Sequence, residues 1–173
     1  CAGASRISPQ VEAVLIGDQL KVVADTLWQI PAQENAMLED YTESIAALIE
    51  QEKPELIVVE PTKRYKLIAG RIAAMLGITV ITDVLELEQD LVAKRMVYGG
   101  TAIRTEKAAS GYTMVMVGSG VLKTESVPEI TVREEKPVPF IEPKIRLKRI
   151  AREEKEKVTA VHWTACRLLS KYG

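Results

Sequence analysis

The chain has 173 residues, 47% hydrophobic and 27% charged, a composition typical of one globular domain with a further segment attached. Its 23 basic and 24 acidic residues give a net charge of −1, so no overall field favours nucleic acid or an anionic membrane as a partner. The longest apolar runs are about half the roughly 20 residues that a membrane-spanning helix needs, so we expect no membrane partner either.

The first third of the chain alternates short apolar runs with one amphipathic segment. Residues 11–17 and 20–24 have the composition of two short strands. Residues 38–52 place apolar side chains at steps of three and four, which predicts a helix that ends before Pro54. The nearly uninterrupted apolar run at 56–60 predicts a strand that is covered on both faces of a parallel sheet.

A second helix and strand follow directly. Residues 61–64 precede a helix predicted over 65–76, Gly77 closes it, and residues 78–81 are the next predicted strand. Strand, helix, strand, helix and strand in this order predict right-handed crossovers, and therefore a parallel sheet.

The pattern changes after Val84. Residues 92–98, 101–107 and 112–117 are three β-rich segments separated by glycine-containing turns, which favours antiparallel strands or a meander over another crossover. The fold class we predict is α/β, with three layers around a mostly parallel sheet and an antiparallel extension. Residues 1–122 would form this domain.

Residues 123–173 have a different character. Prolines and charges are frequent up to residue 143, which predicts an extended arm with one edge strand at Glu129–Arg133. Residues 144–157 are heavily charged and would form a solvated linker or helix. We therefore expect 123–173 to be an arm and a charged linker.

The start of the second helix is the first candidate site. Thr62 could cap this helix, while Lys63 and Arg64 could meet a phosphate or carboxylate at its N-terminus, beyond the carboxyl end of a parallel strand. The alternative is a capped helix whose basic first turn is solvated or pairs with an acidic surface of a partner. Neither of the two standard glycine-rich phosphate loops is present in the sequence.

The helix carries a face of small residues at 69–74. A glycine inside a helix costs about 1 kcal/mol relative to alanine, and close backbone approach is the usual compensation. We therefore expect Gly70 to lie where the helix packs closely on the sheet, in preference to a cofactor site.

The third candidate is the Gly-Gly turn between two of the β-rich segments. Arg95, Tyr98, Gly99 and Gly100 could form an interface with a partner, or could simply cover the sheet. A glycine pair by itself is a weak signal, so both interpretations stay open.

Residues that commonly catalyse reactions or bind metals are scarce. Cys1 and Cys166 match no metal or redox spacing, which fits free thiols in a reducing cytoplasm, the location we expect. A single histidine, His162, leaves no set of metal ligands, so we expect no metal site and no catalytic residues. The first residues lack the pattern of a signal peptide and resemble the end of a helix, so we expect an N-terminal segment to be absent.

A series of motifs resembles the alpha subunit of electron transfer flavoproteins over residues from about 11 to 122. The motifs are residues 67–77 (LIAGRIAAMLG), Thr82-Asp83-Val84, Arg95-x-x-Tyr98-x-Gly100-x-Ala102 and residues 113–118. Thr101 departs from the family, in which Asn is common at this place. Four motifs in one order make the resemblance fairly specific.

The resemblance implies a fold related to adenine-nucleotide α-hydrolases and a partner, an electron transfer flavoprotein beta-type subunit of similar fold. The heterodimer would pass electrons from flavin dehydrogenases to an acceptor. In the family, FAD is held chiefly by a separate C-terminal domain, whose motifs do not occur in the tail Val161–Gly173. We therefore expect that FAD is not bound by this chain alone, and that residues 123–173 lead toward an absent FAD domain.

Two functions remain open from the sequence. The first is an alpha-subunit-like domain that supports electron transfer as scaffold and partner-docking module, more a component of an electron carrier than a catalyst. The second is a stand-alone module that binds AMP, ATP or FAD through residues 62–64. A chain kept only for protein interaction, including a homodimer, is a further alternative.

Overall fold

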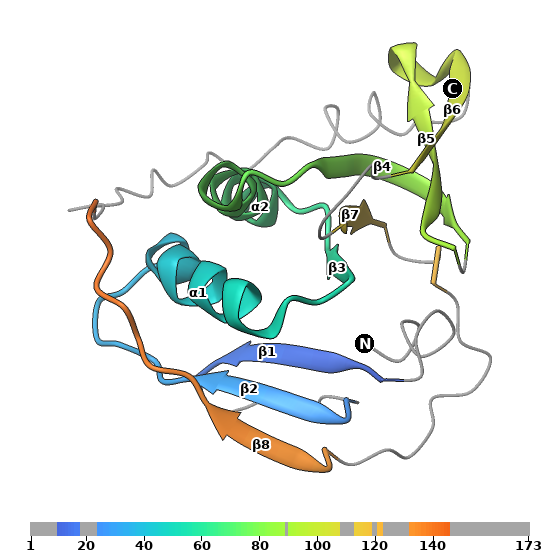
Figure 1. The fold of residues 1–173 in the computed structure, drawn as a ribbon. Helices are drawn as coiled ribbons and strands as arrows, with labels where there is room; N and C mark the ends of the chain where they lie inside the picture. The colour runs from blue at the N-terminus through green and yellow to red at the C-terminus, as the bar shows by residue number, and fades with distance from the viewer. Residues whose placement is uncertain are drawn as a thin grey trace, which may run out of the picture.

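A computed structural model describes residues 10–17, 24–88, 90–107, 113–118, 121–122 and 132–145. Within these ranges, two α-helices accompany strands that divide between a three-stranded and a five-stranded sheet (Figure 1). Strand pairing is parallel between β1 and β2, β2 and β8, β3 and β7, and β4 and β7, and antiparallel on both sides of β5. The α/β class, mostly parallel with an antiparallel extension, is confirmed.

The three-stranded sheet has the order β1-β2-β8. Its strands are β1 (Glu12–Ile16), β2 (Thr26–Ile30) and β8 (Glu134–Pro137). Of the strand predicted at 20–24, only Ala24, which precedes β2, is described; residues 20–23 lie outside the described residues. The strand β2 itself was not predicted, and its Trp28 and Ile30 reach the apolar core.

β8 forms part of the predicted arm but starts after the edge strand expected at 129–133. Residues 132 and 133 precede it, and residues 129–131 are not among those described. β8 is nevertheless an edge strand, parallel to β2, with Pro137 at its end. The charged stretch predicted over 144–157 is described only at residues 144 and 145.

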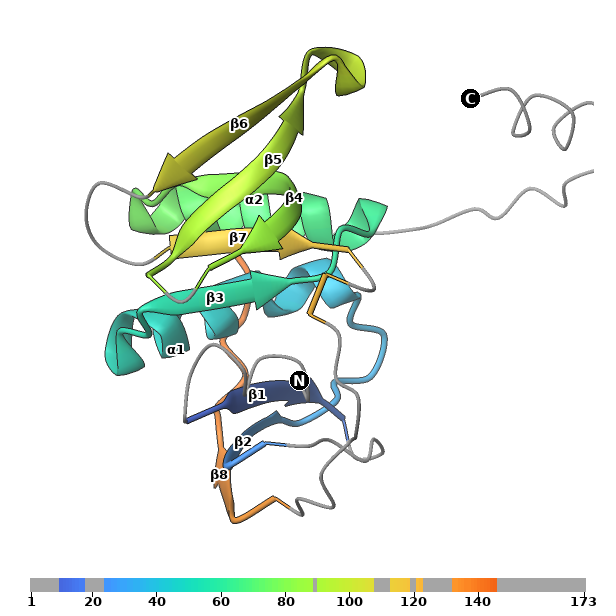
Figure 2. The same cartoon turned by 90° about the vertical axis from the view of Figure 1, so that its right-hand side faces the viewer.

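The five-stranded sheet has the order β3-β7-β4-β5-β6 (Figure 2). Its strands are β3 (Leu56–Val59), β7 (Thr113–Val117), β4 (Val80–Leu87), β5 (Val92–Val97) and β6 (Ala102–Lys107). The antiparallel β5–β6 pair confirms the predicted change of pattern after residue 84. β4 begins close to the predicted strand but runs six residues further and pairs with β5 along this extension.

The antiparallel or meander prediction is wrong for β7. This strand lies between β3 and β4 and is parallel to both. All five of its side chains are buried, the pattern of a central parallel strand that is covered on both faces. The uninterrupted apolar run at 114–117 was a signal for a central parallel strand. An antiparallel strand with one face in solvent alternates apolar and polar residues instead.

Both predicted helices are present. A 3-10 turn, η2 (Leu38–Tyr41), leads directly into α1 (Thr42–Glu52), and α2 spans Lys63–Leu76. Gly77 ends α2 with a left-handed φ of 66°, a conformation that glycine adopts without a steric penalty.

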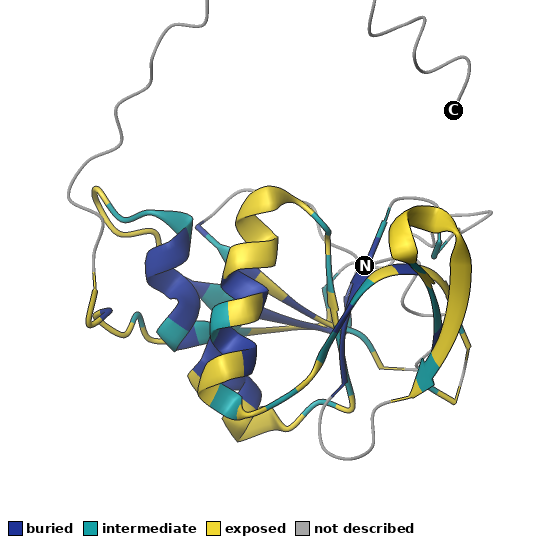
Figure 3. Cartoon of the chain, turned by 90° about the horizontal axis from the view of Figure 1, so that it is seen from above, coloured by how far each residue is buried: buried dark blue, intermediate teal, exposed yellow. Residues whose placement is uncertain are grey.

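Both helices pack on the larger sheet, and α1 also packs on the three-stranded sheet. One apolar cluster joins α1 and α2 to β7, and it comprises Ala46, Ile49, Ile68, Ala69, Ile72, Met114 and Met116. A second cluster joins α1 and η2 to the three-stranded sheet through Trp28, Ile30, Tyr41, Leu48 and Val138. Dark blue bands on the inner sides of the helices mark these contacts in Figure 3.

Gly70 does not lie at a close packing contact. It is exposed, and a Cβ added there would have no neighbour within 4 Å outside the helix's own backbone. Ala69 and Ala73, one turn apart, are the small residues that face the core, at 1% and 8% exposure. The prediction was wrong at Gly70 because the small residues span more of the helix circumference than the buried stripe does.

Candidate functional site

The N-terminus of α2 brings the first three predicted site residues together just beyond the carboxyl end of β3. Thr62 is the N-cap: its Oγ1 accepts a hydrogen bond from the Tyr65 backbone N–H at 3.2 Å. This contact satisfies one of the unpaired donors at the start of the helix. The capping predicted for Thr62 is therefore confirmed.

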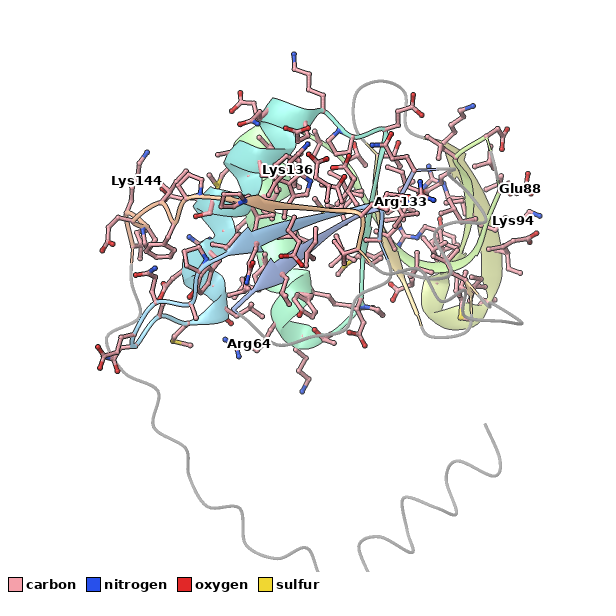
Figure 4. All side chains as sticks on the ribbon, turned by 90° about the horizontal axis from the view of Figure 1, so that it is seen from below. Arg64, Glu88, Lys94, Arg133, Lys136 and Lys144 are labelled. Carbon is pink, nitrogen blue, oxygen red and sulfur yellow. The ribbon has the colours of Figure 1, made fainter. Side chains whose placement is uncertain are left out.

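Arg64 is already engaged by a carboxylate of the same chain. Its Nε donates to Glu39 Oε1 at 2.9 Å and its Nη2 donates to Glu39 Oε2 at 2.6 Å. Glu39 lies in η2 and is 8% exposed, whereas the Arg64 side chain is 53% exposed, on the rim of the molecule in Figure 4. A bidentate pair of this kind fixes the guanidinium in one orientation.

The contact between Arg64 and Glu39 shifts the pKa of each group so that its charged form is favoured. The hydrogen bonds from Arg64 hold the pKa of Glu39 below its ordinary value, against the opposing effect of burial. The same contact raises the pKa of Arg64. Arg71, about two helical turns further along α2, donates from Nη1 to the Glu39 backbone oxygen at 3.3 Å. Glu39 therefore ties η2 to α2 at two places.

The remaining basic residues of the first turn differ in their surroundings. Lys63 is exposed at the first position of the helix. Lys66 forms an ion pair with Asp83 of β4, with 3.6 Å between Nζ and Oδ1, and both side chains are about half exposed. Asp83 has a left-handed φ of 57°, at the irregularity where β4 leaves β7. Of the two predicted anion-binding cations, only Lys63 is not held by a carboxylate in the described structure.

The predicted interface residues separate into two places. Tyr98, Gly99 and Gly100 form the 3-10 turn η3 at the tip of the β5–β6 hairpin, and Tyr98 is 86% exposed. All three have positive φ, of 54°, 65° and 96°. The turn is the yellow loop at the upper right of Figure 3, away from both helices.

Arg95 points toward the sheet, away from the tip. Its Nη2 donates to Thr82 Oγ1 at 3.3 Å, and Nη1 lies 3.9 Å from Glu106 Oε2. The side chain is 25% exposed, and its buried Nε has no hydrogen-bond partner in the described part of the chain. Arg95 therefore connects β4, β5 and β6, and it contributes less exposed surface than the three turn residues.

Two exposed apolar residues at the tip were not predicted. Met96 and Ile103 are directly paired across β5 and β6, and they are 43% and 67% exposed. Together with the exposed Tyr98 of the adjoining turn, we call these residues the hairpin tip. The sequence shows Ile103 as a large apolar residue ahead of four polar ones, but only the β5–β6 register shows that Met96 lies beside it.

The described residues offer little else that resembles a ligand site. A polar cavity of about 340 Å³ is lined by Gln10, Asp25, Thr26, Arg133 and Glu134. It lies where β2 and β8 begin, whereas ligands of parallel sheets bind beyond the carboxyl ends of the strands. No group of three or more potential metal ligands occurs in the described ranges, and Cys1, Cys166 and His162 lie outside them. Neither described helix is long and apolar enough to cross a membrane.

Comparison with known proteins gives one consistent result. A family model described as the electron transfer flavoprotein domain matches residues 1–146. Protein FixB of Escherichia coli O127:H6 is 26% identical over 181 residues, covering 99% of this chain and 58% of FixB. The protein named "Putative electron transfer flavoprotein subunit YdiR" of Escherichia coli K12 is 29% identical over 153 residues, covering 77% of this chain and 49% of YdiR. The chain thus spans about half the length of the curated relatives that it matches.

Proposed function

Since the chain belongs to the electron transfer flavoprotein domain family, we propose that it is an alpha-type domain that serves as scaffold and partner-docking module of a flavoprotein heterodimer. The observation that carries this proposal is the family match, which includes every described element from β1 to β8. The partner would be a beta-type subunit, and the role would be in electron transfer without catalysis by this chain.

The hairpin tip is the surface we assign to partner docking. Tyr98, Ile103 and Met96 are large, exposed apolar or aromatic side chains of the β5–β6 hairpin. Aromatic residues and methionine are enriched in the centres of protein interfaces, and exposed apolar groups gain free energy when a partner covers them. The tip therefore combines the residue types and the exposure that a docking surface needs.

We propose that the described residues of this chain do not hold FAD by themselves. A flavin nucleotide needs donors for its pyrophosphate, and the N-terminus of α2 is the natural place for them. There, Thr62 already accepts the Tyr65 N–H, and Arg64 uses two donors on Glu39. We propose that flavin binding requires further polypeptide beyond these residues, in keeping with the greater length of the relatives.

The same contacts weaken the alternative of a stand-alone module for AMP, ATP or FAD. An incoming phosphate would have to compete with the Glu39 carboxylate for Arg64 and with Asp83 for Lys66. Calorimetric titration of the chain with each nucleotide tests this alternative. Saturable heat that Lys63→Ala abolishes would favour a nucleotide site over the scaffold role.

Association with a beta-type subunit is the direct test of the docking role. The chain, a beta-type subunit and FAD are mixed, and the complex is followed by light scattering and by the visible absorption of flavin. We expect a heterodimer whose dissociation constant rises at least about tenfold in Tyr98→Ser and Ile103→Lys, because each removes apolar contact area.

Leu67→Ser supplies the matched control, since Leu67 is exposed to a similar degree, at 54%, but lies on α2. This variant should associate as the unmodified chain does. Absence of any heterodimer would contradict the proposal. A stable homodimer that the tip variants disrupt would assign the hairpin tip to self-association.

A further inference from the structure

Methionine is the only sulfur-containing residue type in the described part of the chain, because Cys1 and Cys166 lie outside it. The sequence has five methionines. Met114 and Met116 are buried in β7, where an oxidant dissolved in water does not reach the thioether sulfur. Their burial leaves three methionines with access to solvent.

The three remaining methionines lie in different parts of the fold. Met37 precedes η2 and is partly buried. Met75 is 52% exposed near the end of α2, and Met96 is 43% exposed in β5. Met75 and Met96 therefore have similar access to solvent, but only Met96 belongs to the hairpin tip, the surface assigned to docking.

The sulfur of Met96 has a defined position in the hairpin. A Cβ added to Gly100 would lie 3.1 Å from Met96 Sδ and 3.9 Å from its Cγ, so the end of this side chain lies against the backbone of the turn. Met96 is also paired across the hairpin with the exposed Ile103. The thioether thus lies beside the turn that carries Tyr98, at a strand position paired with a second residue of the hairpin tip.

Oxidation changes the polarity of a methionine side chain without giving it a charge. Hydrogen peroxide transfers one oxygen atom to the sulfur: the O–O bond breaks, an S–O bond forms, the sulfur loses two electrons and the peroxide is reduced to water. The product, methionine sulfoxide, carries a polar group in place of an apolar thioether. In an apolar interface the added oxygen loses its hydrogen bonds to water, which costs free energy unless the partner supplies a donor.

At this position the added oxygen should affect docking and not folding. Met96 belongs to none of the apolar core clusters among the described residues. The pairing of β5 with β6 is made by the backbone and does not use the sulfur. In the free chain, therefore, the sulfoxide oxygen of a half-exposed side chain stays hydrated. Its cost arises when a partner covers the hairpin tip.

We infer that Met96 is an oxidation site that regulates the hairpin tip: peroxide converts it to the sulfoxide and weakens docking, and reduction of the sulfoxide restores docking. This inference rests on the docking role proposed above. The reverse reaction is that of a methionine sulfoxide reductase, in which the oxygen leaves as water and a pair of thiols is oxidised to a disulfide.

Peroxide treatment of the full chain provides the test. The chain is oxidised with hydrogen peroxide, treated with dithiothreitol to reduce oxidised thiols, freed of both reagents and mixed with an untreated beta-type subunit and FAD. Peptide mass spectrometry locates each added oxygen atom, and light scattering measures the dissociation constant. We expect sulfoxide at Met75 and Met96, none at Met114 and Met116, and a dissociation constant at least about tenfold higher than before treatment.

Two leucine variants separate the effects of the exposed methionines. Leucine keeps an apolar side chain of similar volume but has no sulfur to oxidise. In Met96→Leu the dissociation constants before and after peroxide should agree within about twofold, whatever the starting value. Met75→Leu is the matched control and should lose affinity on treatment as the unmodified chain does. Methionine sulfoxide reductases A and B, one for each epimer, should restore the affinity of the oxidised chain.

Amide exchange shows whether the hairpin stays folded after oxidation. Exchange in β5 and β6 should differ by less than about threefold between the treated and the untreated chain. Much faster exchange throughout both strands would show that oxidation unfolds the hairpin. That result would overturn the inference, because the loss of docking would then not come from the sulfoxide oxygen at the interface.

Failure of this inference is distinguishable from failure of the docking role. No heterodimer before treatment would contradict the docking role, and the inference with it. Unchanged affinity in a chain whose Met96 is verified as the sulfoxide would overturn the inference alone. An equal loss of affinity in oxidised Met96→Leu would also overturn it, because another oxidised residue would then be responsible.

Discussion

At the scale of single residues, Glu39 is the side chain that fixes the start of α2. It is nearly buried, accepts two hydrogen bonds from Arg64 and offers its backbone oxygen to Arg71. A buried carboxylate is stable only when its charge is compensated, so the pair must be present for η2 to pack where it does. This requirement accounts for Arg64 in the first turn of α2, where the helix dipole by itself disfavours a basic residue.

Glu39→Gln tests that role. We expect a loss of about 1–2 kcal/mol of unfolding free energy at neutral pH, discounted because Arg64 is half exposed. The pKa of Glu39 is lowered in the folded state, so its contribution is fully present above the ordinary carboxyl pKa. It is lost as the pH falls through the lowered pKa. Denaturant unfolding across this acidic range should show the two proteins converging.

Glu50→Gln is the control, because Glu50 is an exposed residue of α1. It should change the unfolding free energy by less than about 0.5 kcal/mol at neutral pH. An equal loss in both variants would show that overall charge, and not the Arg64 contact, determines the effect.

At the scale of elements, α2 and its C-cap contain two glycines with opposite requirements. Gly70 lies in the helix interior without a neighbour, whereas Gly77 ends the helix with a left-handed φ. The first glycine costs helix stability, because it loses more backbone entropy than alanine on folding. The second uses a conformation in which a Cβ is unfavourable.

Gly70→Ala should therefore raise the unfolding free energy by about 0.5–1 kcal/mol, and Gly77→Ala should lower it by about 1 kcal/mol. Thermal or urea unfolding of both variants measures the two effects. A loss of stability in Gly70→Ala would mean that the exposed side of α2 is covered by another part of the protein.

The β5–β6 turn allows a second comparison between glycines. A Cβ on Gly100, at φ 96°, would lie 3.1 Å from Met96 Sδ, whereas one on Gly99 meets nothing within 4 Å. We expect Gly100→Ala to destabilise the chain by about 1 kcal/mol or more, and Gly99→Asn to be nearly neutral, because Asn tolerates the left-handed region. Amide exchange in β5 and β6 would detect the difference locally.

At the scale of the whole molecule, α1 is the element that unites the two sheets. It contacts the β7 cluster through Ala46 and Ile49 and the β2 cluster through Leu48, and Ile45 reaches both. Residues 141 and 144 also return to its first turn, where the Ile141 N–H donates to Ser44 Oγ at 2.8 Å. The segment that follows β8 is thereby attached to the domain.

Ile45→Ala should lower the unfolding free energy by about 2 kcal/mol, near the lower limit for such substitutions because Ile45 is only partly buried. Amide exchange should accelerate in β2 and in β7 together. Leu67→Ala, on the exposed side of α2, should leave both strands unchanged. Acceleration confined to one sheet would show that the sheets are coupled by something other than α1.

The sequence by itself determined the α/β class, the two helices and most of the strands. Steps of three and four over residues 38–52, the apolar run at 56–60 and the Gly77 stop were sufficient, because periodicity and capping act over short distances along the chain. It also located Thr62 as a cap, and the order of motifs from residue 67 to 118 identified the family that the match over 1–146 confirms.

Only the tertiary structure decided which strands are neighbours and which charges are partners. β7 lies at the centre of the larger sheet, because burial on both faces depends on elements far apart in the chain. Arg64 meets Glu39 across 25 positions, and Arg95 turns toward Thr82 while Tyr98 faces solvent. Strands and charges pair with residues that are near in space but far apart in the chain. The local sequence around each position therefore does not predict the partner.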